Sequence, residues 1–467
     1  MGTVHAKASD ISKNAEDSGG LFEFEEPIEL DEEPIQKPQF KLDGVRARVD
    51  RVHVDGLGRT KDDIIKSTVE DLFQATDFED VIVRAHKVRR ALDSMGCFRD
   101  IGVVIDVSTG PGSTPEGLEV TFHVKELSRI VGGVNTTVSE NEGNLVLGVK
   151  MPNILGRGER VQAEYSLGHR SSSNYSLLAS KPFPHKPLAP IVAASVYQQN
   201  HEYPWSGYRL LDRGVLLDLA FNTSPATKHN IQWEGLVRDT SVLSKTTSFK
   251  VRENSGPQMK SVVRHIVCVD HRDEPIFPTR GTRVRFSSEV AGIGGGVAHL
   301  KTELDLQGNL SVTDEVVLQA CGAMGVLHDV FGSSLPDQLF LGGPTSVRGF
   351  QQRGIGPHCD GNAVGGKAYW AVGAHLWAPL PFANTQSGLS SLFRSHAFVN
   401  AGCLADPDES GWRVESLSNV RVSIGAGLAL RLGRVARLEL NYCVPLKATR
   451  DDVKSPGVQF GVGAHFL

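Results

Sequence analysis

One arginine lies in a glycine-rich segment and would need fixed hydrogen-bond partners if it were buried. The segment Phe340–Phe350 reads F-L-G-G-P-T-S-V-R-G-F, so Arg348 follows Val347 and precedes Gly349 and Phe350. A guanidinium offers five donors in a rigid fork and keeps its charge in proteins, so a buried one needs acceptors. Gly349 would permit a tight turn and Phe350 would anchor it by packing. Arg348 therefore needs an acceptor elsewhere in the chain.

Sequence motifs of catalysis and metal binding are absent. Gly292–Gly296 is glycine-rich but lacks the Gly-Lys-Ser/Thr of a phosphate-binding loop, and no HExxH or GxSxG motif occurs. The six cysteines form no CxxC pair, and the sixteen histidines show no ligand spacing. We therefore expect no enzyme activity, no cofactor or metal, and no nucleic-acid partner.

The elements that must position Arg348 are strands, because from about residue 128 onward apolar and polar residues alternate. The alternation is clearest in 420–432, 436–443 and 457–467. These runs exceed the usual strand length of about 5–6 residues. A last strand also leaves a bare edge unless another strand closes it, and Arg129–Val138 is the candidate.

A closed membrane-spanning barrel over residues 128–467 satisfies both conditions. At about 20 residues for each strand with its connection, it would hold roughly 16 to 18 strands. No run of about 18 apolar residues predicts a transmembrane helix. A soluble β-sandwich with one wet face is the alternative that the pattern leaves open.

The N-terminal part divides into a tail and a small α+β domain. Residues 1–45 carry 11 acidic and 4 basic residues, which predicts a disordered tail and neither a secretory signal nor a mitochondrial presequence. Whether this tail is merely solvated or docks basic partners stays open. Residues 46–126 predict the order β-α-α-β-β, with Thr60 as the cap of the first helix because Asp63 follows three residues later.

Two of these features resemble a known family. The segment Gly342–Phe350 resembles the signature of a lumen-inserted loop in the barrel-assembly outer-membrane superfamily, and residues 46–126 resemble its POTRA domain. Phe398–Gly402 resembles the Phe-x-Asp-x-Gly signature of that superfamily, with Asn400 at the aspartate position. The stretches 55–65 and 437–445 are similar to the mitochondrial branch, the barrel subunit of the sorting and assembly machinery (SAM complex).

The resemblance implies a fold and candidate site residues. The fold would be an all-β transmembrane antiparallel barrel of sixteen strands with one N-terminal POTRA domain. Val347, Arg348, Gly349 and Phe350 would form the lumen loop motif. In the family the arginine pairs with the aspartate; here Asn400 offers no charge, and Glu439 faces the lumen by alternation and is the second candidate partner.

The two ends of the barrel are predicted to form a lateral gate. Its first strand has Arg129, Gly132, Gly133 and Val138, and the two glycines would weaken it. On the last strand, the polar-x-Gly-x-x-apolar-x-apolar pattern is similar to the β-signal of mitochondrial barrel precursors; it comprises Gln459, Gly461, Ala464 and Phe466.

The function that the resemblance implies is insertion of unfolded β-barrel precursors into the mitochondrial outer membrane by strand templating at the gate. The POTRA domain would face the intermembrane space. Metaxins, the cristae-organising (MICOS) complex and outer-membrane lipid would be partners. A passive pore of the same architecture is the first alternative, and a soluble β-rich binding protein or enzyme is the second.

Overall fold

The computed structural model describes residues 3–7, 45–138, 143–168, 172–184, 186, 188–313, 315–332, 334–380, 392–406, 418–433 and 436–467. The chain forms two compact units. The first comprises Met1–Val131 with Met151–Arg160 and Pro182–Pro187, and the second comprises Gly132–Lys150, Val161–Lys181 and Leu188–Leu467.

The first unit has the predicted β-α-α-β-β order. Its elements are β2 (Arg48–Asp55), α1 (Asp62–Val69), the short 3-10 helix η1 (Glu70–Gln74), α2 (Phe78–Ser94), β3 (Phe98–Val107) and β4 (Gly117–Glu126). Apolar side chains recur on α2 every three to four residues, so they share one face. This face packs against the sheet to form a buried core that includes Val52, Val54, Val81, Ala85, Val88, Leu92, Val120 and Phe122.

Two predictions for this unit are wrong in detail. Residues Thr3–Lys7 form a strand, β1, that pairs in parallel with β2, although disorder was expected from 1 to 45. This stretch contains no acidic residue, and the edge of β2 offers unpaired backbone groups. The acidic part of the predicted tail lies outside the described residues. Thr60 is not a helix cap, because Lys61 is the N-cap of α1 and the Thr60 hydroxyl donates to Glu126 instead.

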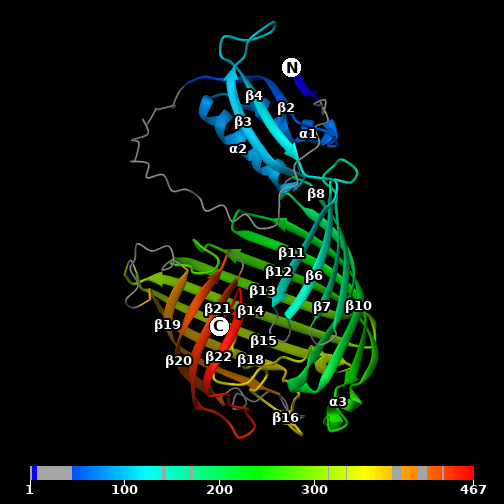
Figure 1. Ribbon diagram of the computed structural model, residues 1–467, viewed down its shortest axis with the longest axis vertical. Helices are drawn as coiled ribbons and strands as arrows, with labels where there is room; N and C mark the ends of the chain where they lie inside the picture. Colours follow the sequence, from blue (N-terminus) through cyan, green and yellow to red (C-terminus); the bar gives the residue numbers. More distant parts are fainter. Residues whose placement is uncertain are drawn as a thin grey trace. The chain divides into compact units, whose positions relative to one another are not determined.

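The second unit is a single sheet of sixteen antiparallel strands, as the resemblance implied, and neighbours in the sheet follow chain order (Figure 1). Its strands are β5 (Val131–Val138), β6 (Gly143–Pro152), β7 (Arg160–Gly168), β8 (Ser173–Pro182), β9 (Ile191–Tyr203), β10 (Tyr208–Asn222), β11 (Thr227–Val242), β12 (Gly256–Asp270), β13 (Gly281–Gly295), β14 (Ala298–Ser311), β15 (Val317–Phe331), β18 (Ala368–Ala378), β19 (Phe393–Ala405), β20 (Arg421–Leu432), β21 (Ala436–Lys447) and β22 (Gly457–Gly463). Short elements in the connections are η2 (Pro204–Ser206), α3 (Phe249–Glu253), η3 (Leu335–Asp337), β16 (His358–Cys359) and β17 (Asn362–Ala363).

The two faces of this sheet differ in the way that a lipid-facing barrel requires. On β21, Leu440 and Tyr442 are 47% and 61% exposed, whereas Glu439 and Asn441, which alternate with them, are 0% and 2% exposed. Apolar side chains therefore point outward and polar ones inward, which is the pattern of a transmembrane barrel. Within the described residues, no helix has the length and apolar character needed to cross a membrane.

The end strands of the sheet are shorter than predicted. The first strand, β5, begins at Val131, so Arg129 precedes it. The last strand, β22, ends at Gly463, so Ala464 and Phe466 lie beyond it. Phe466 is buried, and its ring centroid lies 5.6 Å from the guanidinium carbon of Arg348 and 4.6 Å from that of Arg437.

Candidate functional site

The connection between β15 and β18, residues 332–367, forms the lumen loop that carries the arginine motif. Its side chains contact wall residues such as Asn400 on β19 and Glu439 on β21. Both residues alternate with exposed apolar neighbours, Val399 and Leu440. The loop therefore lies on the inner face of the sheet.

Arg348 binds both partners that the sequence offered. Its Nη2 donates to Glu439 Oε2 at 2.7 Å, and its Nη1 donates to Asn400 Oδ1 at 3.3 Å and to the Leu467 carbonyl at 2.6 Å. The Arg348 and Glu439 side chains are fully buried. The charge that the family places on the aspartate is thus supplied here from β21, at a shorter distance than the amide of Asn400.

Glu439 is shared between two arginines. Its Oε1 accepts from Arg437 Nε at 2.8 Å, and its Oε2 also accepts from Asn441 Nδ2 at 2.9 Å. The Arg348 guanidinium lies over the ring of Phe398, with its carbon 4.9 Å from the ring centroid. Carboxylate acceptors and aromatic faces together compensate a buried guanidinium.

The neighbours of Arg348 fix the loop by packing and by backbone shape. Val347 and Phe350 are fully buried in a cluster with Leu339, Leu341 and other residues of the loop and wall. Gly349 has φ +85, and a Cβ there would lie 3.3 Å from Ser423 Cβ. A side chain at this position would therefore meet both strain and crowding.

The loop is also joined to the last strand. Gln459 on β22 accepts from Gly349 N through Oε1 and donates to the Phe350 carbonyl through Nε2, both at 2.9 Å. The connection before β22 adds a backbone bond from Ser455 N to the Gly349 carbonyl. Of the residues predicted on the last strand, Gln459 hydrogen-bonds to the loop motif, and Phe466 contacts Arg348 through its ring.

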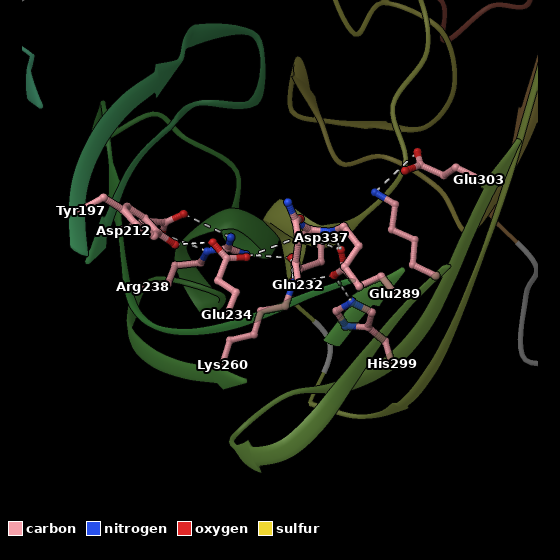
Figure 2. A network of polar contacts seen from close by, with 12 residues as sticks. Tyr197, Asp212, Gln232, Glu234, Arg238, Lys260, Glu289, His299, Glu303 and Asp337 are labelled. Carbon is pink, nitrogen blue, oxygen red and sulfur yellow. Dashed lines mark hydrogen bonds and ion pairs between the residues drawn. The ribbon is translucent and has the colours of Figure 1, made fainter. Parts of the chain in front are cut away.

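A second anchor holds the start of the loop to different strands. Asp337, in η3, accepts through Oδ1 from Lys260 Nζ on β12 (2.6 Å) and from Arg238 Nη1 on β11 (2.8 Å). Figure 2 shows that these cations belong to a wider polar network, in which Arg238 also pairs with Asp212 and Lys260 also pairs with Glu289. Asp337 is the member of this network that the loop supplies.

Three members of this network have the geometry of a metal site. Glu289, His299 and Asp337 bring one ligand atom each within 4.8 Å of one another. The Lys260 ammonium, however, donates to Glu289 at 3.0 Å and to Asp337 at 2.6 Å. A lysine thus provides the positive charge that these carboxylates need, and the cluster serves as an ion-pair network.

A third anchor is Arg353, five residues after Arg348. Its guanidinium carbon lies 4.1 Å from the centroid of the Tyr203 ring and 3.9 Å from that of Phe340, and its Nη1 donates to the Tyr208 hydroxyl at 3.0 Å. Its φ of +58 is uncommon for a residue with a side chain. The aromatic cage compensates this strained backbone.

Comparison with known proteins agrees with this architecture. A family model described as the Omp85 superfamily domain matches residues 153–466. Two proteins described as sorting and assembly machinery component 50 homolog, from Bos taurus and Homo sapiens, are each 42% identical to this chain over the full length of both partners. The chain belongs to the sorting and assembly machinery component 50 family of the Omp85 superfamily.

This family assignment confirms the resemblance found in the sequence. The structure of BamA from Haemophilus ducreyi lacking POTRA domains 1–3 superposes with a TM-score of 0.71 at 16% identity, covering 90% of this chain and 84% of that one. That likeness supports the fold, a β-barrel with a POTRA-like N-terminal unit. Members of the Omp85 family are outer-membrane assembly factors and not enzymes, as the sequence predicted for this chain.

Several anchoring residues of this Omp85 member were missed by sequence reasoning. Asp337 and Arg353 flank the motif in the same loop, and Arg437 lies two positions before Glu439 on β21. The signal for Arg353 was present, because a second arginine close to Arg348 also needs acceptors or aromatic faces. The partners of Asp337 had no such signal, since they lie about 77 and 99 residues away in the chain.

Proposed function

We propose that this protein inserts unfolded β-barrel precursors into the mitochondrial outer membrane by templating their strands at a lateral seam. The seam is the pair of sheet edges formed by β5 and β22. The observation that carries this proposal is the strand order, in which β5 and β22 are the two end strands of the sixteen-stranded sheet. An edge strand presents backbone donors and acceptors that an incoming strand can pair with.

The edge of β5 is suited to receive a strand. Gly132 and Gly133 have no atom within 4 Å of an added Cβ, and the residues around them on β5 are exposed. Glycines weaken a strand, so pairing that involves β5 is easier to open. Insertion then needs no nucleotide, because closing backbone hydrogen bonds and burying apolar strand faces in lipid drive it.

The mitochondrial location, the orientation and the remaining partners belong to the same proposal. The relatives in Bos taurus and Homo sapiens are named for the sorting and assembly machinery, which supports a place in that complex. The POTRA-like unit would face the intermembrane space and receive precursors there. Metaxins and the MICOS complex are the partners that the family resemblance suggests.

Crosslinking across the seam tests the proposal. Single cysteines along β5 are combined with Val458→Cys on β22 in a background without the six native cysteines, and a bifunctional reagent joins them. The crosslinked protein, reconstituted in liposomes, is expected to lose insertion of a labelled precursor barrel, because the edges can no longer separate.

The matched control joins β22 to its paired neighbour. Tyr442 and Val458 are directly opposite in the β21–β22 register and both point outward, so a Tyr442→Cys and Val458→Cys pair should crosslink without effect on insertion. Full insertion activity of the seam-crosslinked protein would refute lateral templating. If depletion of the protein instead lowered only metabolite flux and left other barrels intact, the passive pore would be favoured.

A further inference from the structure

The amide of Gln459 occupies a small backbone site on the lumen loop. Gly349 offers an N–H and Phe350 offers a carbonyl, and the Gln459 amide satisfies both at 2.9 Å. The Gln459 side chain is buried, and all three residues lie in the second unit. The site therefore takes one acceptor and one donor from a single side chain of the strand that lies beside it.

Few side chains match this site. Glutamine carries both an acceptor and a donor on one amide, whereas an ionised glutamate can only accept and a lysine can only donate. Either substitute would leave one buried backbone group of the loop without its partner, which is costly. The site thus discriminates between polar residues as well as between polar and apolar ones.

The next inward-facing position of β22 is shaped by the same loop. A Cβ added at Gly461 would lie 3.1 Å from Pro344 Cβ in the loop and 3.1 Å from Phe466 Cε1. A polar residue followed two positions later by glycine is therefore the pattern that fits the loop surface. The contacts of β22 with the lumen loop thus explain why a polar residue and a glycine stand at positions 459 and 461.

A cavity lies along β22 beside the lumen loop. This cavity, of about 280 Å³, is lined by Gln459 and Gly461, which face inward, and also by Phe460 and Val462, which face outward. Residues of both faces can line one cavity where a strand edge is open. Loop residues including Phe350 and Gln351 form another side of this cavity.

We propose that the Gly349 N–H and the Phe350 carbonyl read the polar residue of a client's terminal strand, and that glutamine is the residue they prefer. This inference rests on the proposed function, because a client strand must first enter the seam. A strand that pairs with β5 takes the place that β22 would have in a closed barrel, so its inward side chains meet the same loop. Gln459 is then the resident occupant that the client replaces.

Peptide binding tests the preference. A fluorescent peptide copying residues 457–467 is titrated against the full-length protein in liposomes, and anisotropy reports binding. Peptides with methionine, lysine or glutamate at the position of Gln459 are expected to bind about tenfold more weakly, the effect of losing one to two hydrogen bonds. A peptide with threonine at the position of Val458, which points outward, is the matched control and should bind like the parent.

The same substitution in the protein should act in the opposite direction. In the Gln459→Met protein the resident strand is held less firmly, so the parent peptide should bind several-fold more tightly than to wild type, whereas Val458→Thr protein should be unchanged. Equal affinity of the glutamine and methionine peptides, or no binding of either, would overturn this inference. Failure of the wild-type protein to insert precursors would instead refute the proposed function.

Discussion

At the residue scale, the central feature is the position of the negative charge that faces Arg348. The acceptor on β19 is the neutral Asn400, and the carboxylate comes from Glu439 on β21. Glu439 also serves Arg437, so one carboxylate holds two guanidinium groups. Removing one partner of a buried pair leaves an uncompensated charge, which costs about 3–5 kcal/mol.

Glu439→Gln is therefore expected to destabilise the barrel by about 3 kcal/mol. Precursor insertion should slow, because Arg348 loses its carboxylate partner and fixes the loop motif less firmly through Asn400 and the Leu467 carbonyl alone. Adding Asn400→Asp to this variant returns a carboxylate to within reach of Arg348 Nη1 and should restore part of both properties. Thermal unfolding in detergent and insertion in liposomes measure the two effects.

Asn400→Asp alone is the control for this rescue, because in that variant Arg348 faces two carboxylates, the new one at position 400 and that of Glu439. If the double variant were no more stable and no faster in insertion than Glu439→Gln alone, the negative charge of Glu439 would not be what Arg348 requires. Insertion at the wild-type rate by a folded Arg348→Ala protein would limit Arg348 to a structural role.

At the element scale, the turn before α1 depends on one carboxylate of the last strand of the first unit. Glu126 on β4 accepts from the Thr60 hydroxyl at 2.6 Å and from the N–H groups of Gly58, Arg59 and Thr60. Burial raises the pKa of Glu126, but these hydrogen bonds outweigh it and hold the pKa below its ordinary value. The ionised carboxylate thus organises a turn that a helix cap was expected to organise.

The stability of this turn should depend on pH. Because the folded pKa of Glu126 is lowered, its contribution is fully present above the unfolded value of about 4.3 and is lost as pH falls through the folded pKa. Glu126→Gln is expected to reduce protection of the 58–60 amides in the full-length protein at pH 7 by about 2 kcal/mol. The difference from wild type should shrink below pH 4.

Hydrogen exchange followed by mass spectrometry measures this protection, and Glu116→Gln, at an exposed position near the start of β4, is the control. A difference between wild type and Glu126→Gln that stayed constant from pH 7 to pH 3 would contradict the role given to the ionised carboxylate.

At the scale of the whole barrel, the lumen loop is tied to two groups of wall strands that lie five to eight positions apart in the sixteen-stranded sheet. Asp337 binds β11 and β12, and Arg348 binds β19 and β21. We expect that loss of either anchor alone leaves the loop in the lumen, because the other anchor and the contacts of Arg353 remain. Loss of Asp337 also leaves the wall intact, because Arg238 keeps Asp212 and Lys260 keeps Glu289.

The Asp337→Asn and Glu439→Gln double variant should therefore release the loop when neither single variant does. Single-channel conductance in planar bilayers is expected to rise in the double variant by more than the sum of the two single effects. The control is the double variant of Asp305→Asn and Glu439→Gln. Asp305→Asn breaks an ion pair between β13 and β14 that does not involve the loop. Strictly additive changes would show that the two anchors act independently.

The sequence by itself determined most of the elements and, together with the family resemblance, the class of fold. Period-two alternation reports which strand face meets lipid, and a 3.6-residue period reports the buried face of α2, because both patterns are local consequences of backbone geometry. The arginine motif and its two candidate partners were also visible, since a buried guanidinium requires acceptors. The strand number came from the family resemblance, because spacing alone left 16 to 18.

Only the tertiary structure decided which distant side chains meet. The three anchors of the lumen loop, the turn of Phe466 into the lumen and the amide contact of Gln459 all join distant segments; Arg348 and Leu467 are 119 residues apart, and Arg353 and Tyr208 are 145 residues apart. Such pairings depend on the curvature of the whole sheet and on the path of the loop through it. No local periodicity carries that information, so the sequence around Asp337 does not show that this residue anchors the loop.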